Sequence, residues 1–202
     1  MIAEKPEINF SLMDDATEPS AAAAQPAQTP RERLTQLGVK QLGTAETFAQ
    51  QIFTLGQRAP LLAEFTQADI QLLTRYMEVF HAPAGCCFIE EGAMDDYMVL
   101  IISGSVEVAK RDNWGQRSRI AVVTPVQTLG EMSMVDGEPR FASCVALEAC
   151  QFGVMSRDSL MRLVREQPAL GAQLLLKLVQ LLSGRLRQTS SKLMAYMAQD
   201  KR

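Results

Sequence analysis

The sequence predicts an α+β protein in which a β jelly-roll barrel lies between N-terminal helices and a long C-terminal helix. Between Val79 and Met155, short runs of alternating apolar and polar residues are separated by Gly, Pro, Asn and Asp. This pattern is typical of many short strands in a sandwich or barrel. On either side of this region, apolar residues recur at three- and four-residue steps, which is the spacing of helices.

Length, charge and hydropathy limit the possible functions. The 202 residues are 47% hydrophobic, which is enough for one well-cored domain with extensions. The net charge of −3 provides no overall positive field that would attract nucleic acid or an anionic membrane. The longest apolar stretches are too short or too amphipathic to span a bilayer, and the acidic N-terminus is unlike a secretory signal. We therefore expect a cytoplasmic protein without membrane association.

Composition divides the chain into four segments. Residues 1–30 are acidic and of low complexity, and we expect them to form a disordered tail. We expect residues 31–77 to be helical, residues 78–156 to form the barrel and residues 157–202 to form the C-terminal helices.

The N-terminal helical segment contains signals for helix ends and starts. Gly38 and Gly43 are expected to divide the run over 31–57 into two helical pieces. Thr66 is a good N-cap residue, and Asp69 three residues later completes a variant of the capping box. A second helical unit is predicted over residues 61–76, with Thr66 as an N-cap within it.

The predicted strands are short and regularly spaced. They cover residues 79–81, 87–89, 97–102, 105–109, 120–123, 143–146 and 151–155. Strand alternation places Met98 and Leu100 on the same face of their strand, and we expect that face to line a ligand pocket.

Glu131 and Arg140 flank a turn that is rich in glycine and contains a proline. Free backbone N–H groups in such a turn make an anion-binding concavity, and an arginine adds a permanent charge whose fork fits phosphate. A nearby carboxylate can accept hydrogen bonds from a sugar hydroxyl. The pair therefore indicates a cradle for phosphate and ribose, although two such residues can also form a solvated surface ion pair.

The same stretch resembles the phosphate-binding cassette of cyclic-nucleotide-binding domains. The family pattern is roughly Phe-Gly-Glu-Leu-Ala followed by Pro-Arg-Ala-Ala-Thr, and here it reads Leu-Gly-Glu-Met-Ser over 129–133 and Pro-Arg-Phe-Ala-Ser over 139–143. The resemblance implies that Glu131 holds the ribose 2′-hydroxyl and that Arg140 pairs with the cyclic phosphate. The ligand-binding residues that it implies in the cassette are Gly130, Glu131, Met132, Arg140, Phe141, Ala142 and Ser143.

Phe141 departs from the family pattern, in which a small residue follows the arginine. The backbone at this position is expected to lie against the phosphate. A phenylalanine here could crowd the usual ligand, or its ring could stack on the base of a different one.

A long helix is predicted to begin at Pro168, after a shorter helix that Asp158 caps and that continues to Val164. Its leucine-rich stripe runs to Leu193, longer than one barrel face needs. Packing on the chain's own barrel and a homodimer seam are both compatible with this stripe, and its length favours the dimer.

Thr189 and Ser190 lie within this helix, in a segment that resembles the central helix of the catabolite-activator branch of the family. In that branch a Thr-Ser pair contacts the base, with one residue from each protomer. The resemblance implies that Thr189 and Ser190 close over the base. That branch continues into a winged helix-turn-helix, whereas this sequence ends at Arg202, so direct DNA binding is not expected.

Several kinds of chemistry have no support in the sequence. No Ser/His/Asp or Cys/His set indicates nucleophilic catalysis, and no phosphate-loop motif is present. The single histidine, His81, has no ligand partner at a metal spacing, and the four cysteines lie in apolar runs without Cys-x-x-Cys pairing. We expect neither an enzyme nor a metal site, no cofactor beyond the ligand, and reduced thiols.

The leading hypothesis is a regulatory protein that binds cyclic AMP or cyclic GMP and signals through a protein partner. One alternative is a degenerate barrel without a nucleotide, a dimeric scaffold for protein contacts in which Phe141 fills the phosphate site. Another is a binder of a different ligand, such as cyclic di-GMP, with Phe141 stacking on a base.

Overall fold

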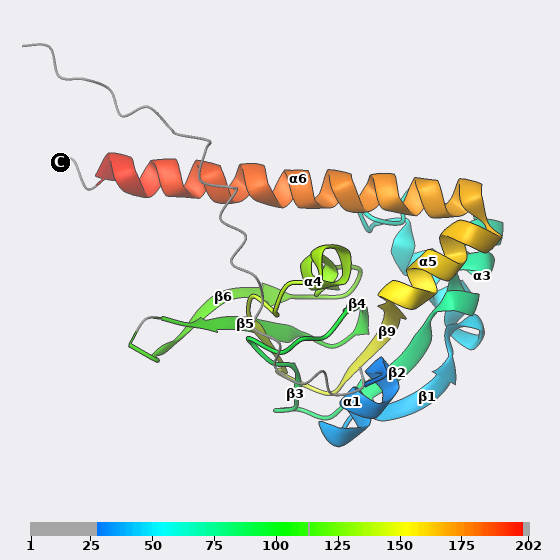
Figure 1. Cartoon of the computed structure of the whole chain (residues 1–202), viewed down its shortest axis with the longest axis horizontal. Coiled ribbons are helices and arrows are strands. Elements are labelled where there is room, and N and C mark those ends of the chain that lie inside the picture. Colours follow the sequence, from blue (N-terminus) through cyan, green and yellow to red (C-terminus); the bar gives the residue numbers. More distant parts are fainter. Residues whose placement is uncertain (1–27, 113, 200–202) are drawn as a thin grey trace, which may run out of the picture.

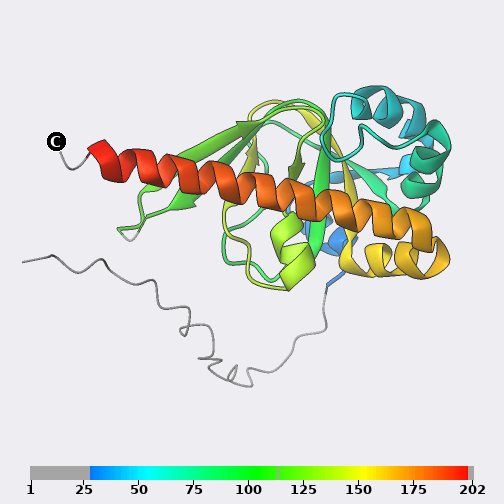
Figure 2. The same ribbon diagram turned by 90° about the horizontal axis from the view of Figure 1, so that it is seen from above.

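The computed structural model describes residues 28–112 and 114–199, and it contains the architecture that the sequence predicts (Figure 1). Two antiparallel sheets form the barrel, and the helix α6 (Pro168–Gln199) runs along one side of it. Seen from above, α6 crosses the molecule and its C-terminal part extends beyond the barrel (Figure 2). The tail predicted over 1–30 lies outside the described residues except at its C-terminal end.

The N-terminal elements are partly different from those predicted. In chain order they are α1 (Pro30–Gln36), β1 (Lys40–Thr44), the 3-10 helix η2 (Ala45–Phe48), α2 (Ala49–Gly56), α3 (Gln67–Leu73) and the 3-10 helix η3 (Thr74–Tyr76). The prediction of two helical pieces over 31–57 is wrong in its middle, because β1 is a strand. Lys40 pairs with His81 in the next strand, so a distant partner decides this conformation. The capping box is confirmed, since the Asp69 N–H donates to Thr66 Oγ1 over 3.2 Å.

The other strands form two sheets. Their bounds are β2 (Glu78–Ala82), β3 (Cys87–Ile89), β4 (Tyr97–Ser103), β5 (Val106–Arg111), β6 (Arg117–Val123), β7 (Thr128–Leu129), β8 (Ser143–Ala146) and β9 (Cys150–Ser156). One sheet has the order β1-β2-β9-β4-β7 and the other the order β3-β8-β5-β6. The predicted bounds of β3 and β8 are confirmed, and the other predicted strands differ by one to three residues at an end. The two residues of β7 were not predicted.

The strand β4 separates two apolar cores. Tyr97, Val99 and Ile101 belong to the core inside the barrel, whereas Met98 and Leu100 belong to the core between the five-stranded sheet and the helices. The expectation that Met98 and Leu100 line a pocket of the barrel is therefore wrong. The period of two is correct, but alternation alone does not say which face turns inward.

Helices connect and follow the last strands. They are α4 (Glu131–Asp136), α5 (Arg157–Glu166) and α6. Ser156 caps α5 in place of the predicted Asp158, because the Ser156 hydroxyl accepts from the Ser159 N–H over 3.0 Å. The helices α5 and α6 pack so closely that a Cβ atom on Gly171 would lie 2.7 Å from Val164 Cα. The N-terminal part of α6 is thereby held against the rest of the fold.

The leucine-rich run of α6 divides between two roles. Leu170, Leu174 and Leu178 are buried in the core between sheet and helices. Leu186 and Leu193 lie further along the helix and are exposed. The first part of the stripe therefore packs on the chain's own core, as one of the two predictions required, and the second part is exposed in this chain.

We predict that Gly104→Ala lowers the free energy of unfolding by about 3 kcal/mol, more than Gly85→Ala. Both glycines have a φ of 80° or more, which costs other residues about 1–2 kcal/mol. A Cβ on Gly104 would also lie 2.6 Å from Cys150 Sγ and 2.7 Å from the Ala149 oxygen, whereas a Cβ on Gly85 would meet nothing within 4 Å. Urea unfolding of both variants measures the difference, and equal losses would contradict this account.

Candidate functional site

The cassette begins where β7 meets α4, beneath the long helix α6 (Figures 1 and 2). The sequence predicts a turn here, and the structure has the six-residue helix α4 inside that turn. Gly130 is the N-cap residue and has a φ of 76°. A Cβ at this position would lie 2.4 Å from Arg140 Nη1 and 2.9 Å from the Tyr97 oxygen. Only glycine therefore allows the arginine to approach the start of the helix.

Arg140 is buried inside the cassette, with its side chain only 1% exposed. Its Nη1 donates to the Gly130 carbonyl over 2.9 Å, and its guanidinium carbon lies 4.4 Å from the centre of the Tyr97 ring. The nearest carboxylate oxygen, Asp95 Oδ2, is 4.0 Å from Nε. Within the described residues, Nε and Nη2 have no hydrogen-bond partner. A buried guanidinium with unpaired N–H groups is costly and favours an anionic ligand.

Glu131 is the first residue of α4 and is also buried. Its Oε1 forms an ion pair with Arg185 of α6, and its Oε2 has no partner among the described residues. Arg185 also donates to the Thr128 carbonyl over 2.8 Å. Burial lowers the pKa of the Arg185 guanidinium. One carboxylate oxygen is therefore held by the long helix, while the other can accept a hydrogen bond.

The second part of the cassette, residues 139–143, is hydrogen-bonded to the turn before β4. The Gly92 N–H donates to the Arg140 carbonyl over 2.8 Å, and the Arg140 N–H donates to the Ala93 carbonyl over 2.9 Å. The Ser143 hydroxyl accepts from the Glu91 N–H over 3.0 Å. This turn therefore fixes the backbone on both sides of Phe141.

Phe141 and Met132 point into solvent rather than into the cassette. The Phe141 side chain is largely exposed, and Lys110 Nζ lies 4.1 Å from the centre of its ring. Met132 is exposed on the surface of α4, and Ala142 is buried next to Phe141. The exposed ring does not agree with the scaffold hypothesis, in which Phe141 fills the expected phosphate site.

Thr189 and Ser190 lie away from the cassette in this chain. Both are exposed on α6, about one helical turn beyond Arg185. Within the part of the chain that the structure describes, neither side chain has a hydrogen-bond partner. The structure thus brings Gly130, Glu131 and Arg140 together, and it leaves Thr189 and Ser190 outside this group.

Three residues of the site were not identified from the sequence. Asp95 and Tyr97 stand beside Arg140 but occur at the start of a strand without any local motif. Arg185 precedes Thr189 by four residues, and this spacing places both on one helix face. That signal could have indicated Arg185.

The other end of α4 is also bound to a C-terminal helix. Arg157 Nε donates to the Met134 carbonyl over 2.7 Å, and Arg157 Nη2 donates to the Ser133 carbonyl over 3.3 Å. A cation here also suits the negative end of the helix. Arginines of α5 and α6 therefore hold the two ends of the cassette helix.

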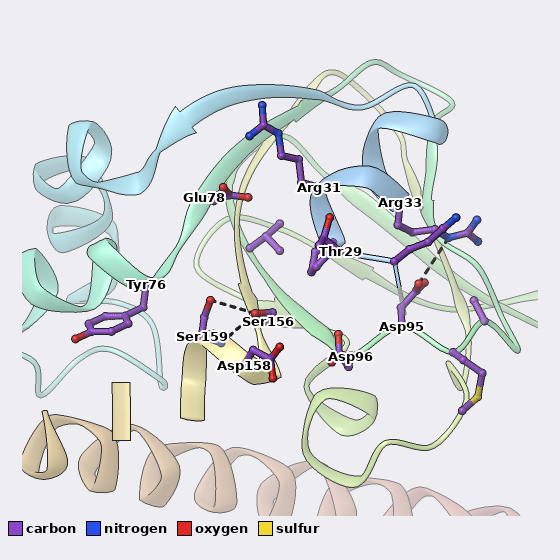
Figure 3. A pocket seen from close by; sticks show the side chains of 15 residues that line it. Thr29, Arg31, Arg33, Tyr76, Glu78, Asp95, Asp96, Ser156, Asp158 and Ser159 are labelled. Atoms are coloured by element: carbon purple, nitrogen blue, oxygen red, sulfur yellow. Dashed lines mark hydrogen bonds and ion pairs between the residues drawn. The ribbon is translucent and has the colours of Figure 1, made fainter. Parts of the chain in front are cut away.

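A separate cavity of about 760 Å³ lies between α1, the strands β2 and β9, and the start of α5 (Figure 3). Its lining includes four carboxylates, from Glu78, Asp95, Asp96 and Asp158. Asp95 pairs there with Arg33, with 3.6 Å between Oδ1 and Nε. Arg31 and Arg33 also line this cavity, whereas Glu131 and Arg140 do not.

No group of three or more His, Cys, Asp or Glu residues in ranges 28–112 and 114–199 could hold a metal ion. All four cysteines are free, two buried and two partly buried. Burial raises the pKa of the Cys144 thiol to about 12 and that of Cys150 above its usual value, which suppresses the reactive thiolate.

Across residues 28–112 and 114–199, no helix combines the length and the apolar character needed to cross a bilayer.

Comparison with known proteins connects this geometry to a family. The family described as "Cyclic nucleotide-binding domain" matches residues 79–167. The crystal structure of a cyclic nucleotide-binding domain from Methylobacillus flagellatus is 36% identical, with a TM-score of 0.70, and the similarity covers 77% of this chain and 88% of that one. The chain belongs to the cyclic nucleotide-binding domain family.

Curated members of this family are less similar. The CRP-like cAMP-activated global transcriptional regulator of Mycobacterium tuberculosis is 29% identical over 136 residues, which are 67% of this chain and 59% of the relative. The cyclic AMP receptor protein of Thermus thermophilus is 27% identical over 135 residues, 67% of this chain and 61% of the relative. The chain spans about three fifths of the length of these relatives. Their names are those of a regulator and a receptor.

In this family member, we predict that Arg185→Met lowers the free energy of unfolding by about 2–3 kcal/mol. The substitution leaves the buried Glu131 carboxylate without its cation, and breaking such a pair is more costly than replacing both partners. The double variant Glu131→Gln/Arg185→Met should therefore lose less than Arg185→Met alone. Urea unfolding measures both, with Arg187→Met on the exposed part of α6 as the control. A double variant that is less stable than Arg185→Met would contradict the prediction.

Proposed function

We propose that this protein is a regulator that binds a cyclic mononucleotide, cyclic AMP or cyclic GMP, in the cassette and transmits its binding through α6 to a protein partner. The observation that carries the proposal is the buried Arg140 guanidinium, whose Nε and Nη2 lack partners within the described residues. A cyclic phosphate supplies the missing charge and two acceptor oxygens in a geometry that suits the guanidinium fork.

Glu131 supplies the second contact. A ribose 2′-hydroxyl can donate to the unpaired Oε2, while Oε1 stays paired with Arg185. The ribose contact and the position of α6 are therefore linked through one carboxylate. A ligand that interacts better with Glu131 when Arg185 is in place favours the docked arrangement of α6 by that difference in affinity.

The exposed Phe141 ring bears differently on the two alternatives. A scaffold in which the ring fills the phosphate site does not agree with a side chain that is 56% exposed. A different ligand, such as cyclic di-GMP, could stack a base on the exposed ring. The cyclic mononucleotide remains the better fit, because the buried contacts provide one phosphate site and one ribose site.

A homodimer through α6 is the second part of the proposal. Seven positions of α6 follow alternating steps of three and four residues: Leu176, Val179, Ser183, Leu186, Ser190, Leu193 and Met197. The apolar members of this seam are exposed in the single chain, and the spacing is that of a two-stranded coiled coil. Ser190 is one of the seam positions, so a partner helix packed along the seam would lie beside Thr189 and Ser190. This arrangement gives Thr189 and Ser190 a role in closing over the base that the single chain does not provide.

Ligand-induced stabilisation tests the nucleotide site. We expect cyclic AMP or cyclic GMP at 100 times its Kd to stabilise the native state by about 2.7 kcal/mol, which raises the melting temperature by roughly 5–10 °C in a protein of this size. The rise should be absent in Arg140→Gln, each variant being compared with its own ligand-free melting temperature. Scanning calorimetry or dye-based melting provides the measurement.

Arg58→Gln is the matched control, because Arg58 is exposed and lies outside the cassette. It should keep the full ligand response. A rise with cyclic di-GMP alone would replace the ligand in the proposal, and no rise with any of the three nucleotides at millimolar concentration would favour the scaffold.

The seam predicts a dimer that a single charge can dissociate. We expect Leu186→Glu to weaken dimerisation at least tenfold, because it places two like charges in the seam and removes two buried leucines worth roughly 1.5–3 kcal/mol each. Gln188→Glu adds the same charge on the opposite side of the helix and should have little effect. Light scattering across a concentration series measures the assembly, and a wild-type protein that stays monomeric would reject the seam.

A further inference from the structure

Phe141 stands where the family pattern has a small residue, directly after the arginine that is expected to bind phosphate. A free phenylalanine side chain at this position could turn towards the cassette and occupy the space of the ligand. The structure holds the ring on the solvent side instead, 56% exposed. The residue that contacts it there is Lys110 of β5.

Lys110 makes three contacts that together hold Phe141. Its Nζ donates to the Phe141 carbonyl over 2.8 Å and lies 4.1 Å from the centre of the Phe141 ring. It also pairs with Glu91, with 3.1 Å between Nζ and Oε1. The ring contact is a cation–π interaction, which favours the outward position of the side chain.

Glu91 anchors the lysine. Its Oε2 accepts from the Arg111 N–H over 2.9 Å, and this hydrogen bond lowers the pKa of the Glu91 carboxyl. Its own N–H donates to the Ser143 hydroxyl over 3.0 Å. Lys110 lies in β5, and its ammonium group is held by Glu91 of the turn before β4. It is therefore not a free surface cation.

The same contacts orient two backbone N–H groups. In a trans peptide the N–H points opposite to the carbonyl. The Arg140 carbonyl accepts from Gly92, so the Phe141 N–H points away from that turn. The Phe141 carbonyl accepts from Lys110, so the Ala142 N–H points away from the lysine. Both N–H groups are thereby directed away from the residues that hold the carbonyls, which leaves them available to an anion.

We propose that Lys110 is a positioning residue of the nucleotide site, which acts by holding the Phe141 ring out of the phosphate cradle. The inference rests on the proposed function, because it assigns a role in nucleotide affinity. Lys110 acts through Phe141 and does not itself bind the phosphate, since its ammonium group is engaged by Glu91 and by the Phe141 carbonyl. The pair explains how a bulky residue can occupy this position in a working cassette.

A double-mutant cycle tests the proposal, with the wild-type protein, Lys110→Met, Phe141→Ser and the double variant. Isothermal titration with cyclic AMP and with cyclic GMP gives the dissociation constants. We expect Lys110→Met to weaken binding at least tenfold when Phe141 is present and by threefold or less in the F141S background, since the small side chain cannot block the cradle. The conservative variant Lys110→Arg keeps a cation over the ring and should bind within about threefold of wild type.

The cycle separates this role from a direct contact with the ligand. An equal loss from Lys110→Met in both backgrounds would mean that the lysine acts on the phosphate itself, and it would overturn the proposal. Unchanged binding by Lys110→Met would overturn it as well.

Urea unfolding of the same four proteins tests the contact without any nucleotide. Lys110→Met should lower the unfolding midpoint more when Phe141 is present than in the F141S background, and equal shifts would reject the contact. If the wild-type protein binds neither nucleotide, the proposed function fails and the role of Lys110 in affinity fails with it. If the wild-type protein binds and only the cycle shows no coupling, the role of Lys110 alone fails.

Discussion

The buried guanidinium of Arg140 is the constraint on which the rest of the site depends. A buried permanent charge is costly to desolvate, so its position depends on the groups that contact it. Gly130 lacks a side chain so that its carbonyl can accept from the guanidinium, and Tyr97 provides the ring beside it. The backbone of Arg140 is held by the turn before β4. Because the side chain is held in this way, Nε and Nη2 keep a fixed position although they have no partner among the described residues.

The short helix α4 connects this charge to the C-terminal helices. Arg157 of α5 binds carbonyls at its C-terminal end, and Arg185 of α6 binds Glu131 at its N-terminal end. A six-residue helix has little stability of its own, so its position depends on these two arginines and on the barrel beneath it. Any ligand that changes the environment of Glu131 therefore acts on α6 through a contact that already exists.

The two parts of the long helix α6 have different surroundings. Leu170, Leu174 and Leu178 complete the core of the chain, and the later apolar residues are exposed beyond it. An exposed apolar stripe with regular three- and four-residue steps is a typical protein interface. Arg185, which pairs with Glu131, and the seam residue Leu186 are neighbours on one helix. A movement of α6 at the cassette would therefore also move the proposed interface.

The sequence by itself determined the barrel, the long helix and the cassette, because strand alternation, helical spacing and the spacing of Glu131 and Arg140 are local patterns. It could not determine the strand β1, the inward face of β4, or the partners Asp95 and Arg185, because each depends on residues distant in the chain. The direction of the Phe141 ring likewise depends on a residue distant in the chain. The sequence shows only a bulky residue directly after Arg140, whereas the tertiary structure brings Lys110 from another strand into contact with its carbonyl and its ring.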